Sequence, residues 1–279
     1  MRELDMGLIT EAVARLCAEA CCELSADVRT LLEKARTEEE SELGCFVLDQ
    51  VLANLEVAAR EQLPICQDTG MAVVFLEIGQ DLHIIGGDIY QAVNQGVRIG
   101  YREGYLRKSV LTPLERINTG DNTPAVIHTE IIPGNRLRII VAPKGFGSEN
   151  MSRLKMLKPS DGISGAKDFI LETVINAGGN PCPPIVVGVG IGGTMEKAAY
   201  ISKKALLRQA GTPNPDPCIA KLEREMLDTI NKTGIGPMGL GGRITALAVH
   251  IDTYPTHIAG LPVAVNIQCH AARHKEAWL

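Results

Sequence analysis

The sequence predicts a mixed α/β fold in which an N-terminal helical layer is followed by a mixed sheet covered by helices. Apolar residues recur at helical spacing through residues 9–60, and β-branched apolar runs bounded by glycine alternate with helical patterns after residue 70. Aromatic residues make up only 4% of the chain, so the core is built from aliphatic side chains. We expect one domain over residues 1–279, with a helical part at 1–62 and an α/β part at 63–279.

The first part of the chain is predicted to form three helices, and the last of them ends before Pro64. The run from Met71 to Gly79 is rich in large apolar residues and predicts a strand, and a helix is expected from about Asp88 to Glu103. Two strands follow at 126–132 and 137–142. The turn sequence Pro133-Gly134-Asn135 between them predicts that they pair as a hairpin.

The second half of the chain alternates between helix and strand signals. A glycine-rich loop at 145–147 leads into a short helical segment, and Ser160-Asp161-Gly162 opens a helix that Gly178-Gly179 closes. The exposed amides of such a glycine-rich junction bind carboxylate or phosphate oxygens. Further elements are a strand at 184–191, helices at 194–208 and 218–232, and closing strands at 245–251 and 262–267.

Composition excludes several classes of partner. The 28 basic and 33 acidic residues give a net charge of -5, which provides no attraction for nucleic acid or an anionic membrane. The N-terminus lacks the apolar core of a signal peptide, and no apolar run is long enough to span a membrane. We therefore expect a cytoplasmic protein whose eight cysteines are reduced and available for metal chemistry.

Three cysteines, Cys66, Cys182 and Cys269, each lie at the edge of an apolar run within turn-forming sequence. Such loops allow a thiolate to leave the core and face a shared cleft. Three thiolates are one fewer than a closed tetrahedral metal site or an electron-transfer iron-sulfur cluster normally uses. We interpret them as ligands of a 4Fe-4S cluster whose fourth iron stays open to bind a substrate oxygen as a Lewis acid.

Other motifs are less informative. Cysteines within helical patterns are assigned to packing, and Cys218, at a helix start, is kept as an outside candidate for a ligand. The G-x-G-x-x-G pattern at 188–193 lies between a strand and a helix, but no second strand with an acidic end follows about 20 residues later. A tight turn at a pocket wall therefore explains it better than a nucleotide site. The packing cysteines are Cys17, Cys21, Cys22 and Cys45.

Several polar residues near these cysteines have two interpretations. Asp68 is either a general acid or base beside the cluster or a turn residue that binds backbone amides, and the spacing favours neither. His257 is similarly ambiguous, because a lone histidine is more often structural. Either His270 or His274 is suited to orienting the Cys269 loop. Arg107 and Lys108 are candidates for binding a carboxylate, and one of them is expected to be a solvated charge.

With these residues assigned, the chain resembles the α subunit of class I iron-sulfur fumarate hydratases and tartrate dehydratases over nearly its whole length. Five segments carry the resemblance: Pro64-Ile65-Cys66-Gln67-Asp68-Thr69-Gly70, residues 147–152, residues 154–162, residues 181–184 with 188–194, and Gln268-Cys269-His270-Ala271-Ala272-Arg273-His274.

The resemblance implies that Cys66, Cys182 and Cys269 ligate the 4Fe-4S cluster. It also implies that Asp68 and His257 are catalytic, and that the substrate faces Gln67, Arg107, Gly145 and Gly147. The active site would be completed by a β subunit that brings further cations and a hydroxyl side chain as catalytic base. A homo-oligomer of such α or αβ units is also expected.

The activity implied by the resemblance is the reversible hydration of a C4 dicarboxylate. Fumarate to (S)-malate is favoured, and conversion of L-tartrate to oxaloacetate is the alternative. An alternative of a different class is a catalytically silent scaffold that carries the cluster and only binds its β partner.

Overall fold

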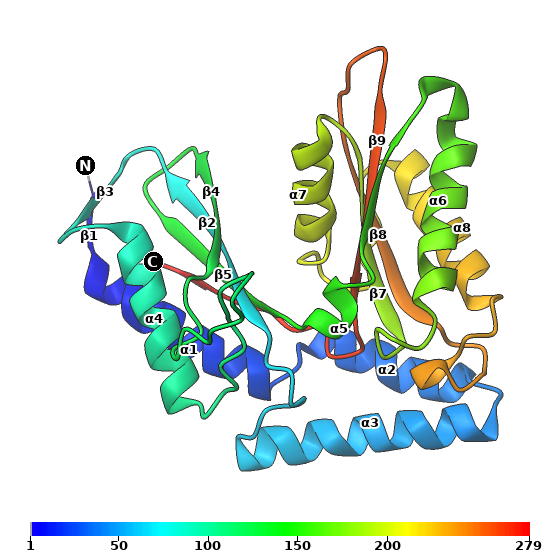
Figure 1. Cartoon of the computed structure of the whole chain (residues 1–279), viewed down its shortest axis with the longest axis horizontal. Coiled ribbons are helices and arrows are strands. Elements are labelled where there is room, and N and C mark those ends of the chain that lie inside the picture. The colour runs from blue at the N-terminus through cyan, green and yellow to red at the C-terminus, as the bar shows by residue number, and fades with distance from the viewer. Residues whose placement is uncertain (1) are drawn as a thin grey trace. The chain divides into compact units, whose positions relative to one another are not determined.

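The computed structural model describes residues 2–279, which fold into two compact units. The first unit consists of residues 2–25, Leu55–Phe146 and Arg273–Leu279, and the second of Ala26–Asn54 and Gly147–Ala272. Each unit has its own sheet and its own core (Figure 1). The prediction of a single domain with a division near residue 62 stays a prediction.

The first unit is built on a four-stranded sheet with the strand order β10-β5-β2-β4, in which β2 runs parallel to β4 and antiparallel to β5. A two-stranded parallel ribbon, β1-β3, accompanies it. The elements of this unit are β1 (Arg2–Asp5), α1 (Met6–Cys22), β2 (Met71–Gly79), β3 (Leu82–Ile85), α4 (Ile89–Glu103), β4 (Val126–Ile132), β5 (Leu137–Lys144) and β10 (Lys275–Trp278).

Helices α1 and α4 lie together over one face of this sheet and form its core (Figure 1). The helices approach closely because α4 presents glycine to α1. A Cβ atom at Gly96 would lie 2.7 Å from the Thr10 carbonyl oxygen, and one at Gly100 would lie 2.5 Å from that of Ala14. The side chains sealed beneath the helices are mostly aliphatic, among them Val13, Leu16, Val74, Leu76 and Ile139.

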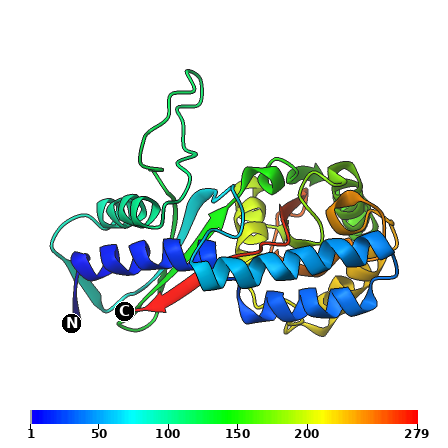
Figure 2. The ribbon, with the colours of Figure 1, turned by 90° about the horizontal axis from the view of Figure 1, so that it is seen from below.

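The segment between α4 and β4 stands away from the rest of the first unit (Figure 2). Its hydrogen bonds include one from the Thr112 amide to the Ile117 carbonyl at 2.8 Å, which closes a turn near its tip. Leu114 and Ile117 are largely exposed on this segment.

The second unit has a four-stranded sheet in the order β6-β9-β7-β8, with β7 parallel to β8 and antiparallel to β9. Helix α7 covers one face, and α6 and α8 cover the other (Figure 1). The elements of this unit are α2 (Ala26–Glu38), β6 (Arg153–Leu157), α6 (Gly162–Ala177), β7 (Ile185–Gly192), α7 (Met195–Ala205), α8 (Pro217–Asn231), β8 (Ala246–Tyr254) and β9 (Leu261–Gln268). Two helices, α3 (Glu42–Glu61) and α5 (Phe146–Glu149), continue from one unit into the other.

Glycines in β7 allow the backbone of α7 to lie directly against the strand. A Cβ atom at Gly188 would lie 2.2 Å from the Ser202 carbonyl oxygen, and one at Gly190 would lie 2.1 Å from that of Ala198. These distances are too short for any side chain. Helix packing therefore explains the first two glycines of the G-x-G-x-x-G pattern, which agrees with rejecting the nucleotide interpretation.

The predicted mixed α/β class is confirmed, as are the three N-terminal helices and the main strands and helices that follow. The hairpin between β4 and β5 is wrong, because β2 lies between these two strands and pairs with both. The turn sequence forms backbone hydrogen bonds with the residues that follow β2 instead, as between the Asp81 amide and the Gly134 carbonyl at 2.9 Å. The short strands β1, β3, β6 and β10 were not predicted from the sequence.

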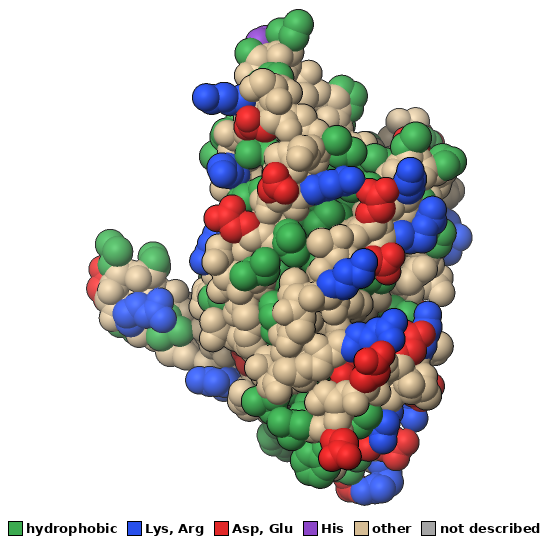
Figure 3. Space-filling model, turned by 90° about the vertical axis from the view of Figure 1, so that its right-hand side faces the viewer, with side chains coloured by type: hydrophobic (Ala, Val, Ile, Leu, Met, Phe, Trp, Pro, Cys, Tyr) green, Lys and Arg blue, Asp and Glu red, His purple; other side chains and the backbone are tan. Residues whose placement is uncertain are grey.

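Basic and acidic side chains alternate over the face seen in Figure 3 and form no patch of a single sign there. Within residues 2–279, no helix combines the length and the apolarity that crossing a membrane requires.

Candidate functional site

The loop that joins α3 to β2 in the first unit carries Cys66. The Cys66 Sγ accepts a hydrogen bond from the Asp68 amide at 3.4 Å and lies 3.3 Å from the Gln67 Oε1. The cysteine is half-buried at the loop surface. Amide hydrogen bonds to sulfur are a usual feature of thiolates that ligate iron-sulfur clusters, so this loop suits a ligand cysteine.

Asp68 joins this loop to the end of β5. Its Oδ1 accepts the Gly70 amide at 3.0 Å, and its Oδ2 accepts the Phe146 amide at 2.8 Å. A Cβ atom at Gly145 would lie 3.0 Å from the Asp68 Oδ2, so a larger residue there would crowd the carboxylate. The structural interpretation of Asp68 is thus observed, and the catalytic one stays a prediction.

The base of the loop is fixed to α4 and β5. The Tyr101 hydroxyl donates to the carbonyl oxygens of Thr69 and Gly70 at 3.0 and 3.2 Å. Gly70 has a φ of 75°, and a Cβ atom there would lie 2.5 Å from the Lys144 carbonyl carbon, so this position requires glycine. The loop is therefore held in one position by buried contacts.

Arg107 is held beside the same loop by its backbone. Its amide donates to the Thr69 Oγ1 at 3.0 Å, and the Thr69 hydroxyl lies 3.2 Å from its carbonyl oxygen. Its side chain is exposed. The first unit therefore groups five of the residues predicted from the sequence: Cys66, Gln67, Asp68, Arg107 and Gly145.

The second unit brings the other two cysteine loops together. Cys182 is exposed on the turn before β7 and has a φ of 54°, a conformation that is uncommon for a residue other than glycine. Cys269 directly follows β9 and is half-buried. The backbone amide and the Nδ1 of His270 lie 3.4 and 3.1 Å from the Cys182 carbonyl oxygen. His270 thus connects the two loops.

Gly147 also lies at this end of the second unit. A Cβ atom added to it would be 3.7 Å from the Asn180 carbonyl oxygen, in the turn that carries Cys182. The hydroxyl of the neighbouring Ser148 is buried and lies 3.3 Å from the Gln268 Oε1 at the end of β9. Helix α5 is thereby placed beside both cysteine loops.

His257 is the predicted site residue that the second unit does not bring to the cysteines. It lies in the connection between β8 and β9, where the Thr256 hydroxyl donates to the Gly193 carbonyl at 2.9 Å. Gly193 follows the far end of β7, whereas Cys182 precedes its beginning. The imidazole Nδ1 of His257 accepts the Ala259 amide at 3.2 Å.

The three predicted ligands are divided between the units, with Cys66 in the first and Cys182 and Cys269 in the second. Residues 2–279 hold no group of three or more His, Cys, Asp or Glu side chains arranged to bind a metal. No disulfide is present among the eight cysteines. All three donors are thiols on loops, which is the donor type that iron-sulfur clusters use.

Three of the four cysteines assigned to packing are buried. Cys17, Cys21 and Cys22 are buried in α1, and burial raises the pKa of Cys21 to about 12. Such thiols stay protonated at neutral pH and are poor ligands. Cys45 is half-buried, and Cys218 is exposed at the start of α8.

Arg273 is a further residue at the Cys66 loop, and its sequence context did not predict a role for it. It is buried in the first unit and donates a hydrogen bond from its Nη2 to the Asp68 carbonyl oxygen. Its burial could not be read from the sequence, because arginine is ordinarily exposed.

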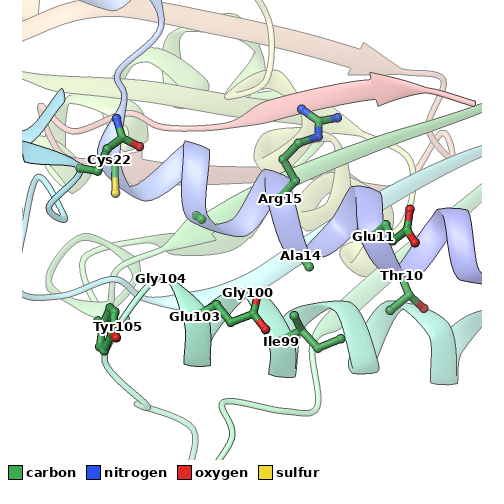
Figure 4. A pocket seen from close by; sticks show the side chains of 12 residues that line it. Thr10, Glu11, Ala14, Arg15, Cys22, Ile99, Gly100, Glu103, Gly104 and Tyr105 are labelled. Atoms are coloured by element: carbon green, nitrogen blue, oxygen red, sulfur yellow. The ribbon is translucent and has the colours of Figure 1, made fainter. Parts of the chain in front are cut away.

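The first unit also contains a cavity of about 610 Å³ between α1 and α4 (Figure 4). Glu11, Arg15 and Glu103 supply its charged groups, and small residues such as Ala14 and Gly100 form part of its wall. None of the predicted site residues lines this cavity. We therefore place the candidate site at the cysteine loops.

The fold defines a mixed α/β protein with free cysteines on loops next to its strands, rather than a nucleotide-binding protein. Residues 10–278 match the model of the family described as "Fumarate hydratase (Fumerase)". A Methanocaldococcus jannaschii protein named "Putative L(+)-tartrate dehydratase subunit alpha" is 48% identical over 271 residues, which cover 95% of each chain. The L(+)-tartrate dehydratase subunit alpha of Escherichia coli K12 is 33% identical over 276 residues, which cover 98% of this chain and 91% of that protein.

The chain therefore belongs to the fumarate hydratase family, whose members are hydro-lyases. The resemblance found in the sequence is confirmed at this level.

Proposed function

We propose that this protein is the α subunit of a hydro-lyase that depends on a 4Fe-4S cluster and interconverts fumarate and (S)-malate. The single observation that carries the proposal is the full-length family match, which includes all three cysteine loops. The local geometry supports it, because His270 joins the Cys182 and Cys269 loops and the Cys66 loop carries Asp68 and Gln67.

In this proposal Cys66, Cys182 and Cys269 hold the cluster. When bound, a cluster with three protein ligands supplies an open iron that acts as a Lewis acid toward a substrate hydroxyl. Arg107 binds a substrate carboxylate through paired hydrogen bonds, for which a guanidinium is well suited. The side chain of Gln67 and the backbone at Gly145 and Gly147 bind further substrate oxygens.

Asp68 is proposed to exchange a proton with the water that leaves or enters. Its two carboxylate oxygens are oriented by the amides of Gly70 and Phe146, so the group is held ready without a change of rotamer. His257 is proposed to act with Asp68 in this proton transfer.

A β subunit is proposed to complete the site. The relatives from M. jannaschii and E. coli are both named as subunit alpha, which implies a second subunit in those proteins. The β subunit would bring further cations for the second carboxylate and a hydroxyl side chain that removes the C3 proton from the opposite face. The isolated α chain would then be inactive.

L-tartrate dehydration to oxaloacetate is the second candidate, and the names of both relatives favour it. Tartrate differs from malate by one additional hydroxyl group at C3. The two substrates share both carboxylates and the hydroxyl that leaves, so the residues named above serve either reaction. The family description names fumarate hydratase, so fumarate is tested first and L-tartrate beside it.

The testing experiment is anaerobic reconstitution of the α chain with iron and sulfide, alone and with its β subunit. We expect about four irons per α chain, hydration of fumarate by the pair, and no turnover by α alone. Parallel assays with malate and L-tartrate, compared by kcat/KM, identify the substrate. A pair that binds the cluster and turns over neither substrate would instead support a scaffold role.

A further inference from the structure

The connection between α2 and α3 carries a buried carboxylate, that of Glu39. The residue is 7% exposed, and both of its carboxylate oxygens accept backbone amides. Oε1 accepts the amides of Glu40 and Ser41 at 2.9 Å each, and Oε2 accepts the amide of Ile244 at 2.8 Å. The Arg243 amide lies 2.9 and 3.0 Å from the two oxygens. A buried charge is costly unless it is hydrogen-bonded, so these amides keep the carboxylate in place.

Glu39 thereby holds the end of a glycine-rich segment, residues 234–242, that has no role in the proposed function. A Cβ atom at Gly242 would lie 2.7 Å from the Glu39 Oε1, so the carboxylate lies directly against the backbone of this segment. Nearer its start, the Gly236 amide donates to the Thr245 Oγ1 at 3.1 Å. Gly236 and Gly242 have φ angles of 69° and 130°, which residues with a side chain rarely adopt. The segment is thus a compact turn that is held near both ends.

This segment supports the Cys182 turn on both sides of the cysteine. The Met238 amide donates to the Pro183 carbonyl oxygen at 2.8 Å. A Cβ atom at Gly239 would lie 2.5 Å from the Cα of Gly179, so the two backbones are in direct contact. The φ of 54° at Cys182 is strained for a residue with a side chain, and such a conformation persists only where the surrounding structure imposes it. The segment is part of that surrounding structure.

We infer that Glu39 is a positioning residue for Cys182, which acts through the 234–242 segment and does not touch the thiol. The carboxylate fixes the segment, the segment fixes the backbone on both sides of the cysteine, and the turn then presents the thiol in one orientation. The consequence for cluster binding rests on the proposed function, in which Cys182 is a ligand. The effect on the turn itself does not depend on that function.

The neighbouring Glu40 provides a matched comparison. Its side chain is 76% exposed, and it binds the Arg243 guanidinium at 2.8 Å, which is itself 55% exposed. Glu40 therefore has the same charge at almost the same place in the chain, but its carboxylate pairs with a side chain at the surface. Exposed ion pairs of this kind contribute little to stability. Loss of the Glu40 charge should leave the Cys182 turn unchanged.

The first test is hydrogen exchange of the full α chain, measured peptide by peptide with mass spectrometry, for the wild type and Glu39→Gln. Glutamine has nearly the shape of glutamate but replaces one acceptor oxygen with a donor, so buried amides lose their partner. We expect exchange over residues 179–185 and 234–244 to be faster by about tenfold, while α4 in the first unit exchanges as in the wild type. Glu40→Gln should match the wild type throughout.

The second test follows the loss of iron from the reconstituted αβ enzyme to a ferrous chelator under anaerobic conditions. Residues that orient a metal ligand typically change metal affinity by about 10-fold to 100-fold. We therefore expect Glu39→Gln to release iron about tenfold faster than the wild type. Glu40→Gln is again the control and should release iron at the wild-type rate.

A second pair of variants interrupts the same path between the segment and the turn. Gly239→Ala adds a Cβ atom that meets the backbone of Gly179 at 2.5 Å, whereas Gly241→Ala adds one with no atom within 4 Å. Both glycines have a positive φ, 74° and 88°, so both variants strain the segment and only the first displaces the Cys182 turn. Gly239→Ala should reproduce the faster exchange over 179–185 and the faster iron loss. This pair decides the inference if Glu39→Gln does not fold.

Three results would overturn the inference. Unchanged exchange over 179–185 in a folded Glu39→Gln chain would show that the carboxylate does not support the turn. Faster exchange throughout the chain, including α4, would show that Glu39 only stabilises the fold. Faster exchange at the turn with iron loss at the wild-type rate would show that the turn does not position a ligand. A wild-type enzyme that binds no iron would contradict the proposed function instead, and the exchange measurements would still decide whether Glu39 holds the turn.

Discussion

The two sheets have the same pairing around their central strand but reach close helix packing in opposite ways. Each has a central strand, β2 or β7, with a parallel neighbour on one side and an antiparallel one on the other, and each central strand follows a cysteine loop. In the first unit the glycines that permit close approach lie on helix α4, whereas in the second they lie on the strand β7. The same pairing around a central strand is thus built from different sequence patterns.

The two cysteine loops that precede the central strands, at Cys66 and Cys182, also differ in how they are held. The Cys66 loop contains a carboxylate, Asp68, whose oxygens accept backbone amides within the first unit. The Cys182 turn contains no carboxylate and is held through its own carbonyl oxygen by His270. The Cys66 loop thus has a carboxylate beside its cysteine, whereas the Cys182 turn has an imidazole.

The largest expected effect comes from removing one ligand from either sheet. Cys66→Ser and Cys182→Ser should each reduce the iron content to less than half and lower hydratase activity of the αβ enzyme by about 10³-fold or more, because in the proposed site both thiols hold one cluster. Iron analysis and anaerobic assays measure the effects. Full iron content in the Cys66→Ser chain would show that Cys66 is not a ligand and that only the cysteines of the second unit bind the cluster. Cys218→Ser, which changes an exposed thiol, is the control.

Asp68→Asn should be the next largest change, with kcat lower by about 10²-fold to 10³-fold because the proton-transferring group is lost. The amide of asparagine can accept through one oxygen only, so either Gly70 or Phe146 loses its partner. We therefore also expect a loss of about 1 kcal/mol in the free energy of unfolding.

Steady-state kinetics and denaturant titration separate these two effects, and the iron content should remain unchanged. Asp81→Asn, in the exposed turn after β2, serves as the matched control and should behave like the wild type. An Asp68→Asn enzyme with wild-type kcat would leave Asp68 only its structural role.

Gly190→Ala tests the glycine-based packing of the second sheet. The added Cβ would meet the Ala198 carbonyl oxygen at 2.1 Å, so α7 must move away from β7. We expect a loss of about 3 kcal/mol in the free energy of unfolding. Thermal unfolding of Gly260→Ala gives the comparison, because no atom lies within 4 Å of a Cβ at that position. Equal stability of the two variants would mean that α7 packs loosely.

We expect low pH to reduce the stability of the second unit and high pH to reduce the stability of the first. In the second unit burial lowers the pKa of His250 to about 4, so the unfolded chain takes up the proton more readily below pH 6.5. Stability is then complete above pH 6.5 and falls as the pH decreases toward 4, by about 2 kcal/mol between pH 7 and pH 5. In the first unit burial raises the pKa of Cys21 to about 12, so stability falls as the pH rises above 9.

Denaturant titrations of the wild type and of His250→Gln across pH 5 to 8 test the acid side. The variant should lose less stability than the wild type between pH 7 and pH 5, since it lacks the group that titrates. Parallel losses in both proteins would assign the acid sensitivity to other residues.

Much of the fold could be predicted because its signals are local. The run from Met71 to Gly79 was bounded correctly by its apolar residues, and Asp88 caps α4 by accepting the Gln91 amide at 2.8 Å. The cysteine loops could be recognised in the same way, since each combines turn residues with the end of an apolar run. The short strands β1, β3, β6 and β10 were missed, because only four or five residues are too few to show a periodic pattern.

What the sequence by itself determined is the type of each main element, the family and the identity of the candidate ligands, because these depend on residue types at fixed spacing. Only the tertiary structure decided how the strands are ordered, since pairing depends on contacts between distant segments. That order places β2 between β4 and β5, brings His270 onto the Cys182 turn, and separates His257 from both cysteines by the length of a strand.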